Sequence, residues 1–299
     1  MSIAEAEAKE LALEQPAGLW RDAFDRFKRN PAAMVGVVVF TALLLIAIFA
    51  PALTSYEPNE QVGPLDNSSP AGPSAEFRFG LDEQGRDYYT RVIYGARLSL
   101  IVGIVSVAVG FSIGMLLGAI AGYFGGWVDG MIMRLMDIML AIPGFLLALG
   151  IVVVLGPGLY QIMIAVGVTN IPIFARLLRS SILAQRESDY VTAARSVGAP
   201  GRRLLVVHVL PNSIAPVIVQ ATLAMATAII DVAGLSFLGL GPADPRLPEW
   251  GTMLAESASR LEQATHLVFF PGFAIVITVL SLNLIGDGLR ESIDPKLRA

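Results

Sequence analysis

Cysteine is absent from the 299 residues, and lysine occurs only at Lys9, Lys28 and Lys296. Without cysteine the chain can form no disulfide, no thiolate nucleophile and no cysteine-ligated metal site. A Walker A nucleotide site needs a glycine-rich turn followed by Gly-Lys-Ser/Thr, and none of the three lysines follows a glycine. If ATP drives this protein, another chain must therefore bind the nucleotide.

Charge is also scarce. Only 15% of the residues are charged, against about 25% in typical soluble domains, whereas 55% are hydrophobic. The apolar residues form runs near the roughly 20 residues that a helix needs to cross a hydrocarbon layer about 30 Å thick. Six such spans are predicted, the third of them extended through 131–137: 32–52, 98–127, 138–155, 159–175, 214–240 and 267–285. The expected fold is an all-α integral membrane protein with six spans.

The basic residues predict the orientation, because Lys and Arg are enriched in cytoplasmic segments. With the N-terminus inside, most of the 21 Lys and Arg residues fall inside, including a cluster at 26–29 directly before the first span. We therefore expect both termini in the cytoplasm. The chain would then comprise a cytoplasmic tail at 1–30, the first span with a long external connection at 31–97, a core membrane domain at 98–290 with an internal loop at 180–211, and a cytoplasmic tail at 291–299.

The second span carries four glycines spaced four residues apart: Gly110, Gly114, Gly118 and Gly122. At 3.6 residues per turn they form one nearly continuous strip. Such a strip lets a second helix approach closely, and membrane helices associate through packing of this kind. We interpret the strip as a helix-packing interface within a tight bundle.

The internal segment 189–211 has the pattern of one short helix followed by another. Ser188 or Asp189 can cap the start of the first helix, Gly198 suits the position after its end, and Pro200 prevents its continuation. Small or apolar residues fall on one face at i, i+3, i+4 and i+7: Tyr190, Ala193, Ala194 and Val197. The second helix runs toward the fifth span.

A helix of about nine residues is marginal alone in water, so the first of these helices is expected to pack against something. One possibility is a cytoplasmic partner subunit, since the membrane domain offers little surface on that side. The other is the bilayer itself, with the helix lying flat and held by Arg195, Arg202 and Arg203. The pattern by itself favours neither.

The same segment resembles the EAA loop of binding-protein-dependent ABC importer permeases. That loop reads Glu-Ala-Ala, three residues, Gly, nine residues, and then a hydrophobic residue, any residue and Leu-Pro. This chain has matching residues at Ala193, Ala194, Gly198, Leu210 and Pro211, but Thr192 replaces the glutamate and His208 stands at the hydrophobic position. The threonine removes the carboxylate that could form an ion pair with an ATPase subunit. The resemblance implies that the loop inserts into a cleft of the ATPase and transmits its closure through Asp189, Tyr190, Thr192, Ala193, Ala194, Gly198, Arg202, Leu210 and Pro211.

Further motifs resemble the C-type permease subunit of dipeptide, oligopeptide and nickel importers, from about residue 20 to the end of the chain. They are NP at 30–31, FGLDEQGRD at 79–87, GARLSL at 95–100, AGYFGG at 121–126, LSFLGLG at 235–241, PEWG at 248–251, GDGLR at 286–290 and DPK at 294–296. This resemblance implies a type I importer permease in the bacterial inner membrane. On that basis the 98–290 domain is the core permease domain.

The resemblance also implies the partners. These are a homologous second permease subunit forming a heterodimer, two ATPase domains on the cytoplasmic side, an external solute-binding protein, and a di- or oligopeptide as cargo within a lipid bilayer. ATP and Mg²⁺ would bind to the ATPases, and no cofactor, metal site, catalytic residue or nucleic acid is expected on this chain. Pro248, Glu249 and Trp250, which lie in an external loop, are candidate contacts for the binding protein.

Two other classes of membrane protein are alternatives. A membrane-embedded hydrolase is disfavoured, because His208 and His266 fall on opposite sides of the bilayer and neither His-Glu-x-x-His nor Gly-x-Ser-x-Gly occurs. A secondary transporter or channel tends to use ionisable residues at mid-membrane, and Asp231 is the only charge deep inside a predicted span. Asp231 either lines a pathway, where it could face the ammonium group of a peptide, or bonds to a neighbouring helix. Asp137 has Arg134 one turn earlier, which predicts a local ion pair.

Overall fold

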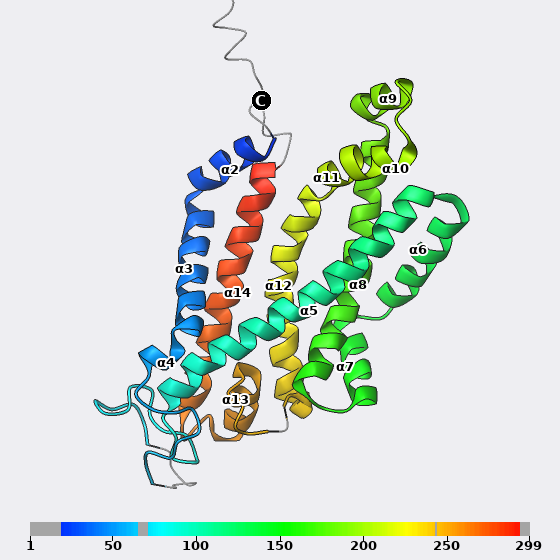
Figure 1. The fold of residues 1–299 in the computed structure, drawn as a ribbon. Coiled ribbons are helices and arrows are strands. Elements are labelled where there is room, and N and C mark those ends of the chain that lie inside the picture. Colours follow the sequence, from blue (N-terminus) through cyan, green and yellow to red (C-terminus); the bar gives the residue numbers. More distant parts are fainter. Residues whose placement is uncertain (1–18, 65–70, 243, 294–299) are drawn as a thin grey trace, which may run out of the picture.

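The computed structural model describes residues 19–64, 71–242 and 244–293, which fold into one bundle of helices (Figure 1). Five helices are long and apolar enough to cross a membrane, and a bent pair of shorter helices can serve as a sixth span. The predicted all-α membrane fold is therefore confirmed. The five are α3 (Pro31–Ile48), α5 (Tyr88–Phe124), α8 (Leu159–Arg186), α12 with its π-helical extension η2 (Ala215–Leu235 and Ser236–Leu240) and α14 (Thr265–Ile293).

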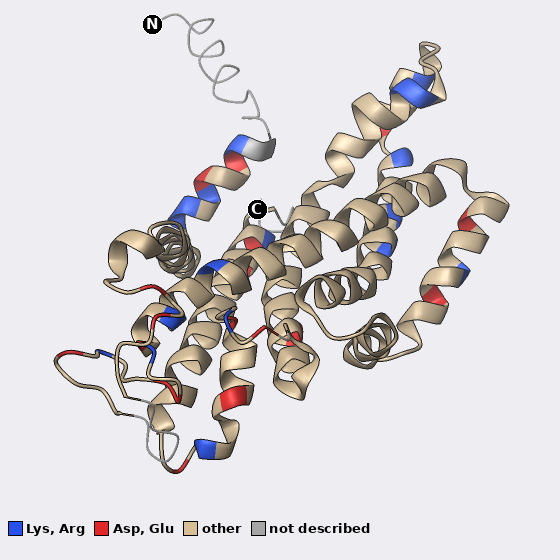
Figure 2. Ribbon diagram, turned by 60° about the horizontal axis from the view of Figure 1, so that its bottom comes forward, with Lys and Arg blue, Asp and Glu red and all other residues tan. Residues whose placement is uncertain are grey.

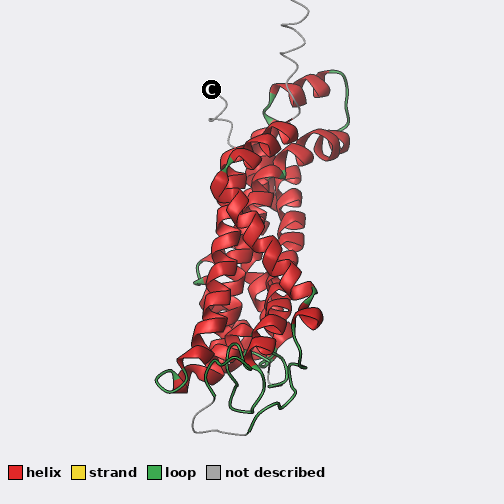
Figure 3. Ribbon diagram, turned by 90° about the vertical axis from the view of Figure 1, so that its left-hand side faces the viewer, coloured by secondary structure: helices red, strands yellow, loops and turns green. Residues whose placement is uncertain are grey.

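The short helices and the loops gather at the two ends of the bundle (Figures 1 and 3). One end, which we call the basic end, carries Lys and Arg on its short helices (Figure 2): α2 (Leu19–Arg29), α9 (Asp189–Ser196) and α10 (Gly201–Arg203). The opposite end, the loop end, carries α4 (Ala50–Leu53), residues 54–64 and 71–87, and α13 (Trp250–Ser257). The N-terminal tail predicted at 1–30 thus includes helix α2, whereas residues 1–18 and 294–299 lie outside the described residues.

Helix α5 is longer than the predicted second span and lies obliquely across the bundle (Figure 1). It begins at Tyr88, because the carboxylate of Asp87 caps its first turn, accepting from the backbone N–H of Thr90 at 2.9 Å and from the Thr90 hydroxyl at 2.6 Å. The domain boundary predicted between 97 and 98 falls inside this one continuous helix. Its 37 residues rise about 55 Å, which exceeds the thickness of a hydrocarbon layer unless the helix is tilted or extends beyond it.

The third predicted span is broken into two helices. Helix α6 (Gly126–Leu140) and helix α7 (Gly144–Leu155) meet at an angle of 89°. Pro143 lies at the break, where it has no N–H to continue the hydrogen bonds of α6. The charge-free run from 138 to 155 therefore is not one helix, and the extension through 131–137 belongs to α6 alone.

The glycine strip of α5 packs directly against α8. A Cβ on Gly118 would lie 2.5 Å from the carbonyl oxygen of Ala175, and one on Gly110 would lie 2.6 Å from that of Gly167. At Gly114 and Gly122 the nearest atoms belong to α8 as well, at 2.6 Å and 2.9 Å. Because the obstacles are largely backbone and Cβ atoms, no larger residue fits without separating the two helices.

Candidate functional site

The 189–211 segment begins with α9, whose end is set by a glycine. Gly198 has φ 86°, a left-handed conformation that other residues rarely adopt. Its N–H donates to the carbonyl of Arg195 at 3.0 Å, and the N–H of Ala199 donates to that of Ala194 at 3.1 Å, so the last carbonyls of α9 are satisfied. The predicted turn at Gly198 is therefore present, although the Ser188 side chain makes no capping bond at the other end.

Helix α9 has one face turned into the bundle and one turned outward. Val191 is 1% exposed and belongs to the main hydrophobic core, against which Ala194 also packs. Ala193 is exposed, and Val197 is 86% exposed. The single apolar face expected from the sequence is thus divided, because Ala194 faces the chain itself while Ala193 and Val197 face away from it.

The hydroxyl of Tyr190 connects α9 with both of its neighbours in sequence. It donates to Oε1 of Gln185, near the end of α8, at 2.6 Å, and it lies 3.3 Å from the carbonyl oxygen of His208. The side-chain amide of Asn212 donates to this hydroxyl at 3.3 Å and to the same His208 carbonyl at 2.7 Å. One phenol oxygen therefore joins the segment before α9 to the segment after it.

The part of the segment that follows α9 packs against the main hydrophobic core. After α10 the chain forms η1 (Leu204–Val209), a π-helix, and then α11 (Leu210–Ser213). Leu204 and Val209 are buried in the same core as Val191, whereas Arg202 and Pro211 are exposed. A π-helix within an α-helical run marks an irregular position that is common at functional sites.

Arg186 ties the start of the segment to the long helix α5. Its guanidinium donates to the carbonyl oxygens of Gly122, at 2.8 Å, and Tyr123, at 3.5 Å, which lie in the last turn of α5. These carbonyls have no partner within their own helix, and a cation also complements the negative end of the helix dipole. A displacement of α9 is thus linked to α8 through the chain and to α5 through this side chain.

At the loop end, Glu249 and Trp250 attach α13 to α5. The Glu249 carboxylate caps α13 by accepting from the N–H groups of Gly251 and Thr252, both at 2.9 Å. The indole N–H of Trp250 donates to the carbonyl of Val92 at 3.0 Å. Glu249 and Trp250 are each 1% exposed, and Pro248 before them is buried too, so these three side chains hold the fold together and do not form an outer surface.

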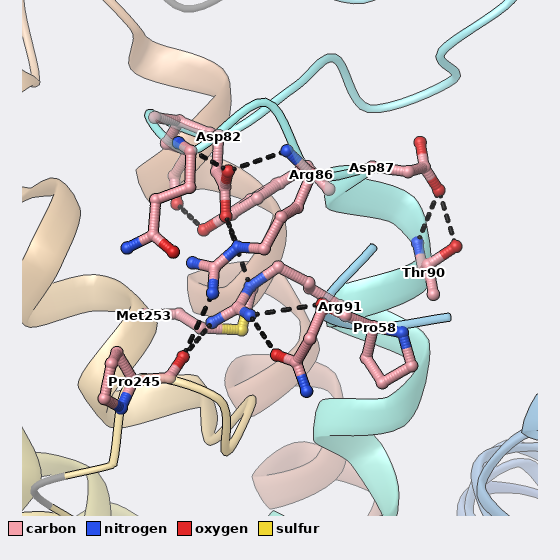
Figure 4. Close-up of polar contacts among 12 residues, drawn as sticks. Pro58, Asp82, Arg86, Asp87, Thr90, Arg91, Pro245 and Met253 are labelled. Atoms are coloured by element: carbon pink, nitrogen blue, oxygen red, sulfur yellow. Dashed lines mark hydrogen bonds and ion pairs between the residues drawn. The ribbon is translucent and has the colours of Figure 1, made fainter. Parts of the chain in front are cut away.

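An ion-pair cluster that the sequence reasoning missed joins three segments of the loop end (Figure 4). Asp82 accepts from Nε of Arg86 at 2.6 Å and lies 3.4 Å from Nε of Arg91. Both arginines also donate to the carbonyl of Pro245, at 3.1 Å and 3.3 Å, and Arg91 donates to that of Pro58 at 3.3 Å. The sequence offered a signal, because charged residues of both signs are concentrated in the FGLDEQGRD motif and the first turn of α5.

Three carboxylates on α6 and α12 differ in their surroundings. Asp231 on α12 is half-buried and has no hydrogen-bond or ion-pair partner in the described part of the chain, which does not support a bond to a neighbouring helix. Asp137 on α6 forms an ion pair with Arg176 on α8, so the predicted pair with Arg134 is wrong. Asp129, two turns earlier on α6, pairs with Arg179 on α8 at 2.5 Å.

Two kinds of solved structure share this arrangement of helices. The MetNI methionine ABC transporter in inward-facing conformations matches with a TM-score of 0.55 over 68% of this chain and 96% of that chain, at 21% identity. An amino acid ABC transporter solved with histidines matches with a TM-score of 0.50 over 66% and 90%, at 16% identity. The fold is therefore that of the membrane subunit of an ABC transporter.

Sequence comparisons define the family. The model of the binding-protein-dependent transport system inner membrane component matches residues 114–299, and that of the N-terminal TM domain of oligopeptide transport permease C matches residues 18–70. The chain therefore belongs to the family of inner membrane components of binding-protein-dependent transport systems, and it is a multi-pass permease subunit, as its motifs predict. Membership of this family implies separate ATPase and binding-protein partners.

Three curated relatives cover nearly the whole chain. The dipeptide transport system permease protein DppC of Alkalihalophilus pseudofirmus is 49% identical over 280 residues, covering 94% of this chain and 91% of the relative. The di/tripeptide transport system permease protein DppC of Pseudomonas aeruginosa is 45% identical over 296 residues, covering 98% and 97%. The glutathione transport system permease protein GsiD of Salmonella typhimurium is 45% identical over 281 residues, covering 93% and 91%.

Proposed function

We propose that this chain forms half of a translocation pore for di- or oligopeptides. A homologous second permease subunit would supply the other half, two ATPase domains would bind ATP and Mg²⁺, and an external solute-binding protein would deliver the cargo. The observation that carries the choice of cargo is the agreement of three relatives, which are named for dipeptides, for di- and tripeptides, and for glutathione, itself a tripeptide.

The 189–211 segment is the proposed coupling loop to the ATPase. Support comes from its outward surface, where Thr192, Ala193 and Val197 are exposed beside the exposed Gly198 and Arg202. A small-residue surface of this kind suits insertion into a protein cleft better than contact with water. The inward side of the same segment is fixed to α5 and α8 through Arg186 and the Tyr190 hydroxyl, which gives a path for transmitting ATPase closure. The basic end would accordingly face the cytoplasm.

The loop end would face the solute-binding protein. Pro248, Glu249 and Trp250 stay part of this proposal as residues that position the loop, because their side chains are buried. The residues directly before them, 244–247, are exposed and are the better candidates for contact. Asp231 stays the candidate for the pathway, since it is partly exposed and lacks a partner among the described residues.

Reconstitution tests the proposal. The purified chain alone in lipid nanodiscs should hydrolyse no more ATP than empty nanodiscs. In proteoliposomes that also contain the second permease and the ATPases, with the binding protein outside, radiolabelled dipeptide should accumulate only when ATP and Mg²⁺ are present. Competition by unlabelled dipeptide, glutathione and Ni²⁺ identifies the cargo. Accumulation driven by a proton gradient without ATP would instead support a secondary transporter.

A further inference from the structure

Helix α6 exposes two adjacent strips of different chemistry. Four large apolar residues lie at i, i+4, i+8 and i+11 and are between 54% and 79% exposed: Trp127, Met131, Leu135 and Ile138. Beside them, four small or charged residues lie at i, i+4, i+7 and i+11 and are also exposed: Gly130, Arg134, Asp137 and Ala141. The first strip suits lipid, whereas the second, which carries both signs of charge (Figure 2), does not.

Helix α8 presents a matching strip. Its exposed residues at i, i+3, i+7 and i+11 are Ile173, Arg176, Ser180 and Ala184. The Arg176–Asp137 ion pair joins this strip to the polar strip of α6, and its two side chains are 47% and 51% exposed. By contrast, the exposed residues of α14 between positions 269 and 280 are all apolar and between 52% and 61% exposed: Phe269, Phe273, Val276 and Leu280.

The Arg176–Asp137 pair lies about three helical turns from the end of α8 at the basic end of the bundle. Arg186 ends α8 at the level where α5 ends, since it binds the carbonyls of Gly122 and Tyr123. Arg176 is ten residues before Arg186, and ten residues of helix rise about 15 Å, which is roughly half of a hydrocarbon layer. Charged side chains at such depth face a bundle interior or a water-filled cavity, because exposure to lipid is costly.

We infer that Arg176 and Asp137 line the inner half of the translocation pathway, where they meet the charged termini of a passing peptide. The inference rests on the proposed function. A guanidinium can bind a peptide carboxylate through two parallel hydrogen bonds, and Asp137 can accept from the peptide ammonium group. Because both side chains are half exposed, a zwitterion reaches them without disrupting the helices. Arg134, exposed one turn from Asp137, makes this part of the pathway net positive.

Accessibility to a charged reagent tests the position of the two strips. The chain has no cysteine, so single cysteines can be placed in the assembled transporter without altering this subunit further. Ser180→Cys and Ala141→Cys lie on the polar strips, and Leu135→Cys and Val276→Cys are matched controls on apolar faces. A membrane-impermeant methanethiosulfonate, applied to inside-out vesicles, should modify the first two at least about 10-fold faster, because thiol reactions require the hydrated thiolate. Slow modification at all four positions, with peptide uptake intact, would overturn the inference while leaving the proposed function standing.

A charge swap separates a pathway role from a structural one. The double variant Asp137→Arg with Arg176→Asp keeps the ion pair but reverses its charges toward the pathway. We expect normal membrane yield and ATPase activity, with dipeptide uptake lowered about 10-fold, since charged hydrogen bonds to the peptide termini are exchanged for repulsion. The matched control, Asp129→Arg with Arg179→Asp, should keep uptake within about 2-fold, because an intact ion pair suffices where the role is structural. Wild-type uptake in the first swap would show that the Arg176–Asp137 pair only holds α6 to α8.

Discussion

At the residue scale, single polar atoms join segments that are distant in sequence. The Tyr190 hydroxyl links Gln185 to the carbonyl of His208, and the Trp250 indole N–H links α13 to Val92 of α5. Hydrogen bonds of this kind contribute only about 0.5–1.5 kcal/mol each to stability. Their importance here is geometric, because each fixes the position of a short helix that could not hold its place alone.

Removing the Tyr190 hydroxyl is expected to weaken coupling rather than folding. In Tyr190→Phe the ring stays, while the bonds to Gln185 and Asn212 are lost, so α9 can move without carrying α11 with it. We expect near-normal ATPase activity with about 5-fold fewer peptides transported per ATP, since one neutral hydrogen bond contributes about 1 kcal/mol and this free energy corresponds to about a 5-fold change in an equilibrium. The measurement is the ratio of uptake to phosphate release in proteoliposomes. Tyr160→Phe, at a tyrosine that is 75% exposed at the start of α8, is the control, and an unchanged ratio in Tyr190→Phe would contradict this role.

At the element scale, two glycine-dependent features determine how helices meet. The α5–α8 contact depends on residues without a Cβ, and the end of α9 depends on a residue that tolerates a positive φ. The two requirements are different, since the first concerns space and the second backbone conformation. Substitutions should therefore fail for different reasons at the two places.

Gly118→Ala should destabilise the bundle. Its Cβ would lie 2.5 Å from the Ala175 carbonyl oxygen, a backbone atom that moves only if α8 moves. Overpacking of this kind costs about 1–3 kcal/mol, which should appear as a lower midpoint of thermal unfolding in detergent. Gly150→Ala on α7 is the matched control, because no atom lies within 4 Å of its Cβ position and alanine favours helix. Equal midpoints for the two variants would argue against a close α5–α8 contact.

Gly198→Asp should abolish transport without removing the protein from the membrane. Aspartate at φ 86° is strained, and its charge would stand on the surface proposed to enter the ATPase. We expect wild-type amounts in membrane fractions, no peptide uptake, and ATPase activity that no longer responds to the loaded binding protein. Gly72→Asp, in an exposed part of the external connection with no atom within 4 Å of its Cβ, is the control. Uptake at the wild-type level in Gly198→Asp would refute the coupling-loop assignment.

At the scale of the whole molecule, hydropathy predicted the membrane spans. Each crossing helix must satisfy the hydrogen bonds of its own backbone N–H and C=O groups and must carry apolar side chains. Hydropathy misplaced the start of α5, because the charges of Arg91 and Arg97 placed these residues in the preceding loop. Both belong to the helix, and the charge of Arg91 is paired with Asp82. Hydropathy also missed the break at Pro143 and the partner of Asp137. The break follows from a proline that hydropathy does not register. The partner of Asp137 depends on a contact with α8, and periodicity within one segment carries no information about contacts between helices far apart in sequence.

The orientation of the whole molecule gives the last prediction. The basic end carries α2, α9 and α10, and Lys and Arg next to spanning helices are retained on the cytoplasmic side. Val197→Cys, at an 86% exposed position of the basic end, should therefore react with an impermeant maleimide only in inside-out vesicles. Leu247→Cys, 37% exposed at the loop end, should react only in right-side-out vesicles. Leu280→Cys, on an apolar face of α14, is the control that should react in neither. The reverse pattern would place the 189–211 segment outside the cell, where no ATPase could reach it, and coupling through this segment would then be impossible.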